Sequence, residues 1–536
     1  MDLQRLLLKN TAIARYFLER VPSGLLLKLG KKKSSVAIKF AKKTKAYSTF
    51  LKKQNLLNEK KLENLPIIDK NNYIDKYSLE ELAIESLEDN YTIEQSSGYG
   101  GKPYYWVRYV GQDDTMSNYL QLGLEKTFLI HKRKTIFINT MALGTWVAGT
   151  KLARSSCEVA NKKGNRMTVI NAGTVKEDIV NAIKDLAQYY EQILFIGYPP
   201  LLEDIFETTV KQGYFPKEKH IGIIAGGESF PESWRDYVTT LFEKVSVKDL
   251  RIFSAFGAAD TGLEIGYEQP ITVKLRKLLA ENHELRHKYL GEKVNYTPHF
   301  FQYNPMSIYI EEHKGELVFT ARAGIPIVRY NLHDSGGIFT YQEMRNILKD
   351  GGVDVEKYEK ENKPMKLPIV YIYGRSDGSI SVDGANIYIQ DIQSVLTDDE
   401  KLFKYMNINY KKSASFEKKV PYPDLAGKIF EESNYLDLDK EKYFRIINSF
   451  KLSGNLNRIE VFIELMDGVK LNNKEREIFR KGLFKAMVLL LMEQSANYRA
   501  LVEEQLKSSD LILHIVQYGE EPFSLKKSIK KKHIIK

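Results

Sequence analysis

Residues 193–228 read ILFIGYPPLLEDIFETTVKQGYFPKEKHIGIIAGGE. The stretch opens with the apolar run Ile193–Ile196, continues through a helix-like segment at Pro200–Gln212, and returns to a second apolar run at Ile221–Ile224. Short apolar runs of this kind are typical of buried strands, whereas the longer segment between them has the length of a helix. A strand, a helix and a second strand in this order predict an α/β domain whose sheet is at least partly parallel.

The same alternation extends to the apolar run Thr135–Ile138 and to the helical stretch Val175–Tyr190. The tail has a different order, with a strand expected at Arg458–Leu465, a long helix at about 473–506 and a strand at Leu511–Tyr518. We therefore predict an α/β fold in which a large, multi-layer N-terminal domain has β-sheets flanked by helices. A small α+β C-terminal domain follows it.

Changes in composition along the chain suggest where the domains begin and end. Residues 1–90 contain few glycines and have apolar residues at helical spacing, which predicts a helical N-terminal region. The core domain is expected at 91–375, and a mobile C-terminal domain at 376–536. Within this region, the segment Leu65–Tyr77 is interpreted as a connector with a Pro break.

The composition is that of a globular protein: of 536 residues, 43% are hydrophobic and 28% charged. The net charge of +11 favours anionic partners. The single cysteine, Cys157, excludes an intrachain disulfide and is expected to be buried. The apolar clusters of the N-terminus are interrupted by Arg and Lys, and the longest later apolar run, Ala486–Met492, has seven residues. We therefore expect a soluble, cytoplasmic protein.

The first chemical signal is the segment Ser96-Ser97-Gly98-Tyr99-Gly100-Gly101-Lys102-Pro103. Its three glycines allow the backbone to approach a phosphate closely, while hydroxyl and backbone N–H groups surround the phosphate oxygens. Lys102 adds a positive charge. A Walker loop needs Ser or Thr directly after Gly-Lys, and Pro103 stands there, so a Walker NTPase is not expected.

Four later segments place Gly together with a carboxylate or an Arg where a strand is expected to end. They are Ala225–Glu228, Phe256–Gly262, Pro326–Asp334 and Tyr373–Ile380. Ligands of open α/β sheets bind at the carboxyl ends of the strands. The order of these segments therefore predicts that they meet around one ligand.

This ordered series, over about residues 65–395, resembles the adenylate-forming superfamily of acyl-CoA synthetases, adenylation domains and luciferases. The nearest branch in its motifs is that of phenylacetate–coenzyme A ligase and capsule-type proteins. The resemblance implies that a small carboxylic acid attacks ATP to give an acyl-adenylate and pyrophosphate. It also implies transfer of the acyl group to an acceptor thiol. Coenzyme A is the preferred acceptor, and a carrier-protein thiol or another nucleophile is the alternative.

The resemblance also implies residue roles, which begin with a loop that would hold the triphosphate: Ser96, Ser97, Gly98, Gly100, Gly101 and Lys102. The nucleotide side would be completed by Gly226, Gly227, Glu228, Phe256, Gly257, Asp334 for the ribose, and Arg375 for ribose or phosphate. Asp260 would replace the family's magnesium-binding Glu, and Asp377 would be the hinge between domains. A C-terminal lysine would bridge substrate and phosphate, Lys530 by preference and Lys527 second.

The sequence departs from the family pattern in two motifs. Tyr99-Gly100 stands where two Thr are usual, which removes two hydroxyls from the loop, and Ala259 stands where Ser or Thr is usual. Asp260 is shorter than the usual Glu, so we expect it to hold Mg²⁺ from further away or through water. These departures leave open an altered or inactive member of the superfamily.

Two alternatives belong to other classes. The sequence His283-Glu284-Leu285-Arg286-His287 matches the HExxH motif of a zinc metallopeptidase, although the surrounding helix is highly charged. A non-catalytic nucleotide-binding or membrane-surface protein is the second alternative, because the Lys-rich segment Lys28–Lys45 is suited to peripheral contact with an anionic membrane. Nucleic acid is not an expected partner, since Tyr104-Tyr105-Trp106 is explained by a strand after the loop.

Overall fold

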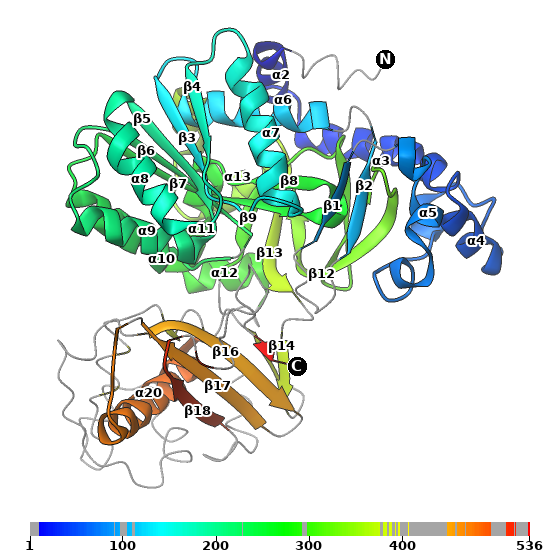
Figure 1. Ribbon diagram of the computed structural model, residues 1–536. Helices are drawn as coiled ribbons and strands as arrows, with labels where there is room; N and C mark the ends of the chain where they lie inside the picture. Colours follow the sequence, from blue (N-terminus) through cyan, green and yellow to red (C-terminus); the bar gives the residue numbers. More distant parts are fainter. Residues whose placement is uncertain are drawn as a thin grey trace. The chain divides into compact units, whose positions relative to one another are not determined.

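The computed structural model describes residues 10–89, 92–96, 104–109, 113–227, 229–291, 297–375, 379–382, 385–388, 447–455, 458–466, 468–494 and 511–518, and the single residues 392, 395, 396, 402, 406, 520, 534 and 535. The chain divides into two compact units. The first comprises Met1–Phe230, Arg235–Leu285 and Pro298–Gly374, and the second comprises Pro231–Trp234, Arg286–Thr297 and Arg375–Lys536. Each unit is described by itself (Figure 1).

The first unit starts with short helices whose boundaries follow from their capping residues. The side chain of Asn10 accepts hydrogen bonds from two backbone N–H groups of the first turn of α2, and Thr44 does the same once for α4. Ser78 and Glu81 form a reciprocal capping box on α5. The helices are α2 (Thr11–Leu18), α3 (Ser23–Ala41), α4 (Lys45–Lys53) and α5 (Leu79–Leu82), with 3₁₀ turns η1 (Leu62–Asn64), η2 (Ile74–Lys76) and η3 (Leu87–Asp89).

The centre of the first unit is an eleven-stranded mixed sheet with the order β10-β11-β12-β13-β9-β8-β7-β6-β5-β3-β4. Its parallel part contains β3 (Thr135–Asn139), β4 (Met167–Asn171), β5 (Gln192–Gly197), β6 (His220–Gly226) and β7 (Asp249–Ala258). Every residue of β3 and β5 is buried, as expected for strands covered on both faces. Helix α6 (Asp113–Phe128) precedes β3, and the helices between the strands are α7 (Val147–Asn161), α8 (Lys176–Leu186), α9 (Pro199–Lys211) and α10 (Glu232–Glu243).

The other half of the sheet is antiparallel in the pairs β7–β8, β8–β9, β9–β13, β11–β12 and β10–β11. Its strands are β8 (Leu263–Tyr267), β9 (His299–Tyr303), β10 (Ile308–His313), β11 (Glu316–Ala321), β12 (Ile327–Phe339) and β13 (Ile369–Arg375). A separate hairpin pairs β1 (Thr92–Gln95) with β2 (Tyr105–Arg108). The remaining elements of this unit are η4 (Ala187–Tyr189), η5 (Ala259–Thr261), α11 (Pro270–Glu281), α13 (Tyr341–Asp350) and α14 (Val355–Asn362). Helix α12 (His283–Leu290) belongs to the second unit from Arg286 onward.

The second unit contains a small sheet with the order β18-β17-β16-β19 and the long helix α20 (Asn473–Gln494). The helix is buried over the whole run Ala486–Met492. The strands are β16 (Ile447–Asn455), β17 (Arg458–Leu465), β18 (Leu511–Val516) and β19 (Ile534–Ile535), together with the hairpin β14 (Ser379–Val382) and β15 (Ala385–Tyr388). A large mixed sheet flanked by helices and a small C-terminal sheet confirm the predicted α/β class.

Candidate active site

The carboxyl ends of four parallel strands lie along one edge of the large sheet. The register places Asn139 beside Ile196 and Gly226 beside Ala255, so β3, β5, β6 and β7 reach this edge together. Gly226 is the last residue of β6, and Gly227 follows with a φ of 83°, a left-handed conformation that favours glycine. Strands β6 and β7 therefore bring the predicted residues Gly226 and Gly227 next to Phe256 and Gly257.

Phe256 lies near the end of β7, and its ring packs against the interior. The ring stacks on Phe301 with centroids 5.6 Å apart and lies 6.4 Å from the ring of Phe319. Phe301 in turn stacks on His299 at 5.6 Å. Phe256 is half-buried, whereas Gly257 is exposed. An adenine ring would consequently have to use the part of Phe256 that does not face Phe301.

Asp260 lies in η5, immediately after β7, and is almost completely buried. Its Oδ1 atom accepts a hydrogen bond of 2.6 Å from the hydroxyl of Tyr330, which belongs to β12. The ammonium nitrogen of Lys70 lies 3.2 Å from the same oxygen. Two segments that are remote in sequence thus converge on the carboxylate for which the sequence predicts metal binding.

The glycine-rich loop begins and ends on the β1–β2 hairpin. The main-chain N–H of Ser96 donates to the carbonyl of Tyr104 at 2.9 Å, and the N–H of Tyr104 donates to the hydroxyl oxygen of Ser96 at 3.0 Å. Ser96 is buried, so its hydroxyl closes the base of the loop. The other predicted loop residues lie outside the described residues: Ser97, Gly98, Gly100, Gly101 and Lys102.

A buried charge cluster connects this hairpin to η5. Arg108 donates to Glu94 at 2.7 Å, and the ammonium nitrogen of Lys151 lies 3.8 Å from the other oxygen of Glu94. Arg108 also donates to the carbonyl of Ala259, and Lys151 donates to that of Gly262 at 3.3 Å. Buried cations need such partners, and here the partners fix the loop base beside the turn that contains Asp260. None of the sequence motifs indicates this cluster.

The segment interpreted as a connector also contributes to the site. The backbone of Ile68 pairs with β12 through a 3.1 Å bond to the carbonyl of Arg329 and a 2.8 Å bond from the N–H of Asn331. This pairing brings Lys70 to Asp260. The residues between the N-terminal helices and the core therefore form part of the site as well as joining two parts of the chain.

Lys70 and Asp75 both contact Tyr104, the first described residue after the glycine-rich loop. The Lys70 nitrogen lies 5.2 Å from the centroid of the Tyr104 ring, and the Tyr104 hydroxyl donates to Asp75 at 3.0 Å. Partial burial and then the carboxylates of Asp75 and Asp260 raise the pKa of Tyr104 to about 12, so the hydroxyl stays protonated at neutral pH. These contacts hold the end of the loop against the connector.

Asp334 lies inside β12, whereas the sequence analysis placed its motif at a strand end. The register advances from Val318–Asn331 to Glu316–Ser335, so extra residues of β12 form a bulge. His333 in this bulge has a φ of 61° and lies 3.4 Å from Asp69 and 3.6 Å from Glu316. The bulge interrupts the regular alternation of side chains along β12 in the segment that contains Asp334. Asp334 itself is buried.

Arg375 is the last residue of β13, the strand that neighbours β12 in the sheet. The two strands are in close contact, since a Cβ atom on Gly336 would lie 2.0 Å from the carbonyl oxygen of Tyr371. The backbone therefore places the Arg375 and Asp334 segments on adjacent strands. The remaining predicted residues fall outside the described residues: Glu228, Asp377, Lys527 and Lys530.

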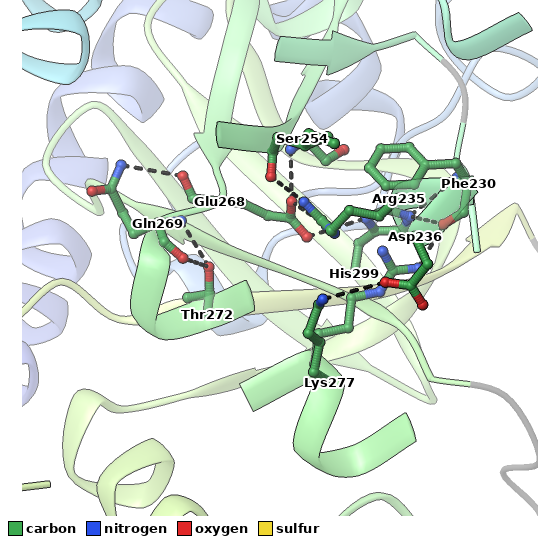
Figure 2. Close-up of polar contacts among 11 residues, drawn as sticks. Phe230, Arg235, Asp236, Ser254, Glu268, Gln269, Thr272, Lys277 and His299 are labelled. Atoms are coloured by element: carbon green, nitrogen blue, oxygen red, sulfur yellow. Dashed lines mark hydrogen bonds and ion pairs between the residues drawn. The ribbon is translucent and has the colours of Figure 1, made fainter. Parts of the chain in front are cut away.

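A second buried network surrounds Glu268 and includes Arg235, His299 and Phe230 (Figure 2). Glu268 accepts a 2.9 Å hydrogen bond from Arg235 and a 2.6 Å bond from the N–H of Ser254. Burial alone would raise the pKa of Glu268, but Arg235 and His299 outweigh burial and hold this pKa far below its usual range. Glu268 is therefore an ionised carboxylate in the interior.

The same network fixes the chain at Phe230, three residues after Gly227. Arg276 donates to the carbonyl of Phe230 at 2.6 Å, and the N–H of Phe230 donates to Nε2 of His299 at 3.2 Å. The same Nε2 atom lies 3.0 Å from the carbonyl oxygen of Phe230, and Nδ1 of His299 lies 3.6 Å from Glu268. The network thus anchors the segment that the sequence analysis assigns to the adenine side.

The network makes stability depend on pH. Burial, and next the positive charge of Arg276, lower the pKa of His299 to about 4. A histidine in the unfolded chain has a pKa of about 6.5, so between these values the unfolded state binds the extra proton and stability falls as the pH falls. We expect a loss on the order of 3 kcal/mol from pH 7 to 4 that His299→Gln does not show, measured by urea unfolding. An equal loss in His299→Gln and the wild type would contradict this, and His283→Gln, at an exposed site, is the control.

Two further expectations concern single residues. The HExxH motif lies on α12, with His283 and Glu284 exposed, and within the described part of the chain no three His, Cys, Asp or Glu side chains are grouped to hold a metal. Cys157, which we expected to be buried, is exposed, because it lies off the face of α7 that packs inward through Leu152, Ser156 and Val159.

Among the helices that the structure describes, none combines the length and apolarity needed to cross a membrane.

Comparison with known proteins gives likeness in structure alone. No protein-family model matches the chain, and no curated protein matches it in sequence. A 2-hydroxyisobutyryl-CoA ligase in complex with an acyl-AMP has a TM-score of 0.58 at 11% identity, covering 97% of this chain and 91% of the ligase. The acyl acid amido synthetase AtGH3.15 has a TM-score of 0.57 at 11% identity, covering 99% and 95%. The chain has the fold of the adenylate-forming enzymes.

Proposed function

We propose that this protein activates a carboxylic acid with ATP and transfers the resulting acyl group to a thiol, most directly that of coenzyme A. The observation that carries the proposal is the convergence on Asp260. Lys70 from the connector and Tyr330 from β12 contact its carboxylate, and Tyr104 joins the base of the glycine-rich loop to the same place. The adenylate-forming fold supports the same reaction.

The reaction needs activation because a free carboxylate has no adequate leaving group. In the first step a carboxylate oxygen forms a bond to the α-phosphorus of ATP, and the bond to pyrophosphate breaks. In the second step a thiol loses its proton and attacks the acyl carbon, and AMP leaves with the electron pair. The first step brings anions together, so cations placed beside the phosphates stabilise its transition state.

Among the described residues, Asp260 is suited to act as a ligand of Mg²⁺. Mg²⁺ in phosphate-transfer sites is commonly held by one or two carboxylates and the phosphates of the substrate. Asp260 is a buried carboxylate at the end of a strand, and both of its protein contacts use Oδ1. In our proposal Asp260 therefore holds Mg²⁺ together with the phosphates of ATP. The ion supplies charge neutralisation when bound.

The remaining roles follow from the family resemblance and are part of the proposal. The loop Ser96–Lys102 holds the triphosphate, Phe256 with its neighbouring glycines lines the adenine, and Asp334 binds the ribose. Arg375 contacts ribose or phosphate, and Asp377 acts as the hinge. Either Lys530 or Lys527 bridges the acid and the phosphate. The narrower likeness to phenylacetate–coenzyme A ligase rests on the sequence motifs alone.

Lys70 adds a role that the family motifs did not suggest. Its ammonium group lies between Asp260 and Tyr104, where the triphosphate is expected, so it supplies positive charge to the phosphates. We expect Lys70→Met to raise the KM for ATP about tenfold, equivalent to ~1.4 kcal/mol, with Lys70→Arg close to the wild type. Steady-state pyrophosphate release measures both. Lys76→Met, on an exposed residue of the same segment, is the control.

The Lys70 test has a result that contradicts it. If Lys70 serves only to neutralise Asp260, Lys70→Met lowers the Mg²⁺ concentration that gives half-maximal rate and leaves the KM for ATP unchanged. A titration with Mg²⁺ at saturating ATP separates the two roles, because only a phosphate contact changes the ATP dependence.

An amine acceptor is the second candidate, since the chain also has the fold of an acyl acid amido synthetase. A pyrophosphate-release screen over carboxylic acids, with coenzyme A or amino acids added, tests the proposal and the acceptor together. We expect acid-dependent pyrophosphate, with a thioester as the product that accumulates. An amide product would show that the acceptor is an amine rather than a thiol. Nucleotide binding without release of pyrophosphate for any acid would indicate a non-catalytic protein.

A further inference from the structure

The outer face of α3 combines exposed aliphatic side chains with lysines. Leu25, Leu29 and Val36 are exposed by 49%, 37% and 37%, and the exposed lysines Lys28 and Lys32 accompany them. At 3.6 residues per turn these positions, together with the exposed Lys39, fall within an arc of about 100°. We call this set, Leu25, Lys28, Leu29, Lys32, Val36 and Lys39, the α3 stripe.

The opposite face of α3 fixes the stripe outward. Leu26, Ala37 and Ala41 are buried on the inner side. Gly30 lies so close to the chain at Pro305 that a Cβ atom would be 2.4 Å from its carbonyl oxygen. Such close packing leaves α3 no room to rotate, so the stripe stays on the surface of the first unit.

The surroundings of the stripe are strongly positive. Between Glu19 and Glu59 the sequence has ten lysines and no acidic residue. Among these lysines, Lys31 pairs with Glu63 at 3.7 Å and Lys45 pairs with Glu81 at 3.5 Å. The side chains of Lys31 and Lys45 remain more than half exposed in these pairs. Such a surface attracts anions over a Debye length of about 10 Å at moderate salt.

We propose that the α3 stripe binds the surface of an anionic lipid membrane. A helix lying in the membrane interface buries its aliphatic side chains among the acyl chains while its lysines contact anionic headgroups. The stripe offers both groups on one face. A nucleic acid would bind the lysines and leave Leu25, Leu29 and Val36 in water. It would therefore explain the charge of the stripe but not its exposed aliphatic side chains. This inference is independent of the proposed ligase activity.

Vesicle co-sedimentation of the full-length protein tests the proposal. We expect binding to vesicles of phosphatidylcholine mixed with phosphatidylglycerol and none to phosphatidylcholine alone. Replacing Lys28, Lys32 and Lys39 by Gln should weaken binding about 10²-fold in total, since each basic residue near an anionic surface contributes roughly a factor of five. Replacing Leu25, Leu29 and Val36 by Ser should weaken it about tenfold or more at low salt.

A matched charge control uses exposed lysines elsewhere on the first unit, with Lys211, Lys217 and Lys244 replaced by Gln. This variant should bind vesicles as the wild type does. Three results overturn the proposal: equal loss in the control variant, unchanged binding in the Ser variant, or binding of the wild type to duplex nucleic acid but not to vesicles. Thermal melting of each variant verifies the fold, which these exposed positions leave intact.

Discussion

Glu268→Gln should lower the free energy of unfolding by about 3–5 kcal/mol, the usual cost of breaking a buried ion pair by removing one partner. The side chain of Glu268 is fully buried, and it accepts a hydrogen bond from Arg235, which is itself buried. The amide still accepts hydrogen bonds but removes the negative charge that Glu268 presents to the buried Arg235. Urea unfolding followed by tryptophan fluorescence measures the change.

The matched control for this variant is Glu356→Gln. Glu356 also pairs with two cations, Arg345 at 3.1 Å and Lys349 at 2.5 Å, but its side chain is 60% exposed. Solvent screens such an exposed pair, so Glu356→Gln should lower the free energy of unfolding far less than Glu268→Gln does. If Glu268→Gln lowers the free energy of unfolding no more than Glu356→Gln does, the charge of Glu268 does not hold the chain at Phe230. The buried network would then stabilise this segment through packing.

Asp260→Asn should reduce the rate of pyrophosphate formation by about 10²-fold or more under the proposed function. Asparagine has the same shape and still accepts the hydrogen bond from Tyr330, so the local fold is retained. It lacks the negative charge that a Mg²⁺ ligand in this position requires. The variant should therefore bind ATP and fail at the chemical step, as single-turnover kinetics at saturating acid would show.

Tyr330→Phe is the control for Asp260→Asn. It removes the 2.6 Å hydrogen bond to Asp260 and leaves the carboxylate charged, so the rate should fall by less than about tenfold. Equal losses in the two variants would assign the effect to the geometry of the turn. If Asp260→Asn forms pyrophosphate at the wild-type rate, Asp260 is not a catalytic residue. The other proposed nucleotide contacts would then be tested separately.

The parts of the fold that the sequence predicted are those encoded locally. Strand β6 is recognisable because an apolar run between two parallel neighbours is buried on both faces, and β17 occupies the expected range Arg458–Leu465. Gly226 and Gly227 end β6 as expected, because a glycine pair after an apolar run marks the end of a strand. Asp260 follows β7 directly for the same local reason.

The features that escaped prediction depend on contacts between distant segments. Lys70 is one of many lysines in a Pro-containing segment, and only the pairing of Ile68 with β12 brings it to Asp260. Glu94 and Lys151 meet because the hairpin lies beside α7, which no spacing in the sequence indicates. Asp334 lies inside a strand because a bulge interrupts β12. Cys157 shows that residue type alone does not settle which face of a helix is buried.

The central claim is that the acid becomes joined to AMP through one of its own oxygens. Incubating the protein with ATP, coenzyme A and a carboxylic acid labelled with heavy oxygen in the carboxylate tests it directly. The account predicts one heavy oxygen in the phosphate of the released AMP, since the acyl carbon–oxygen bond breaks in the transfer step. Heavy oxygen in inorganic phosphate alongside ADP, or unlabelled AMP beside a formed thioester, would contradict an acyl-adenylate intermediate.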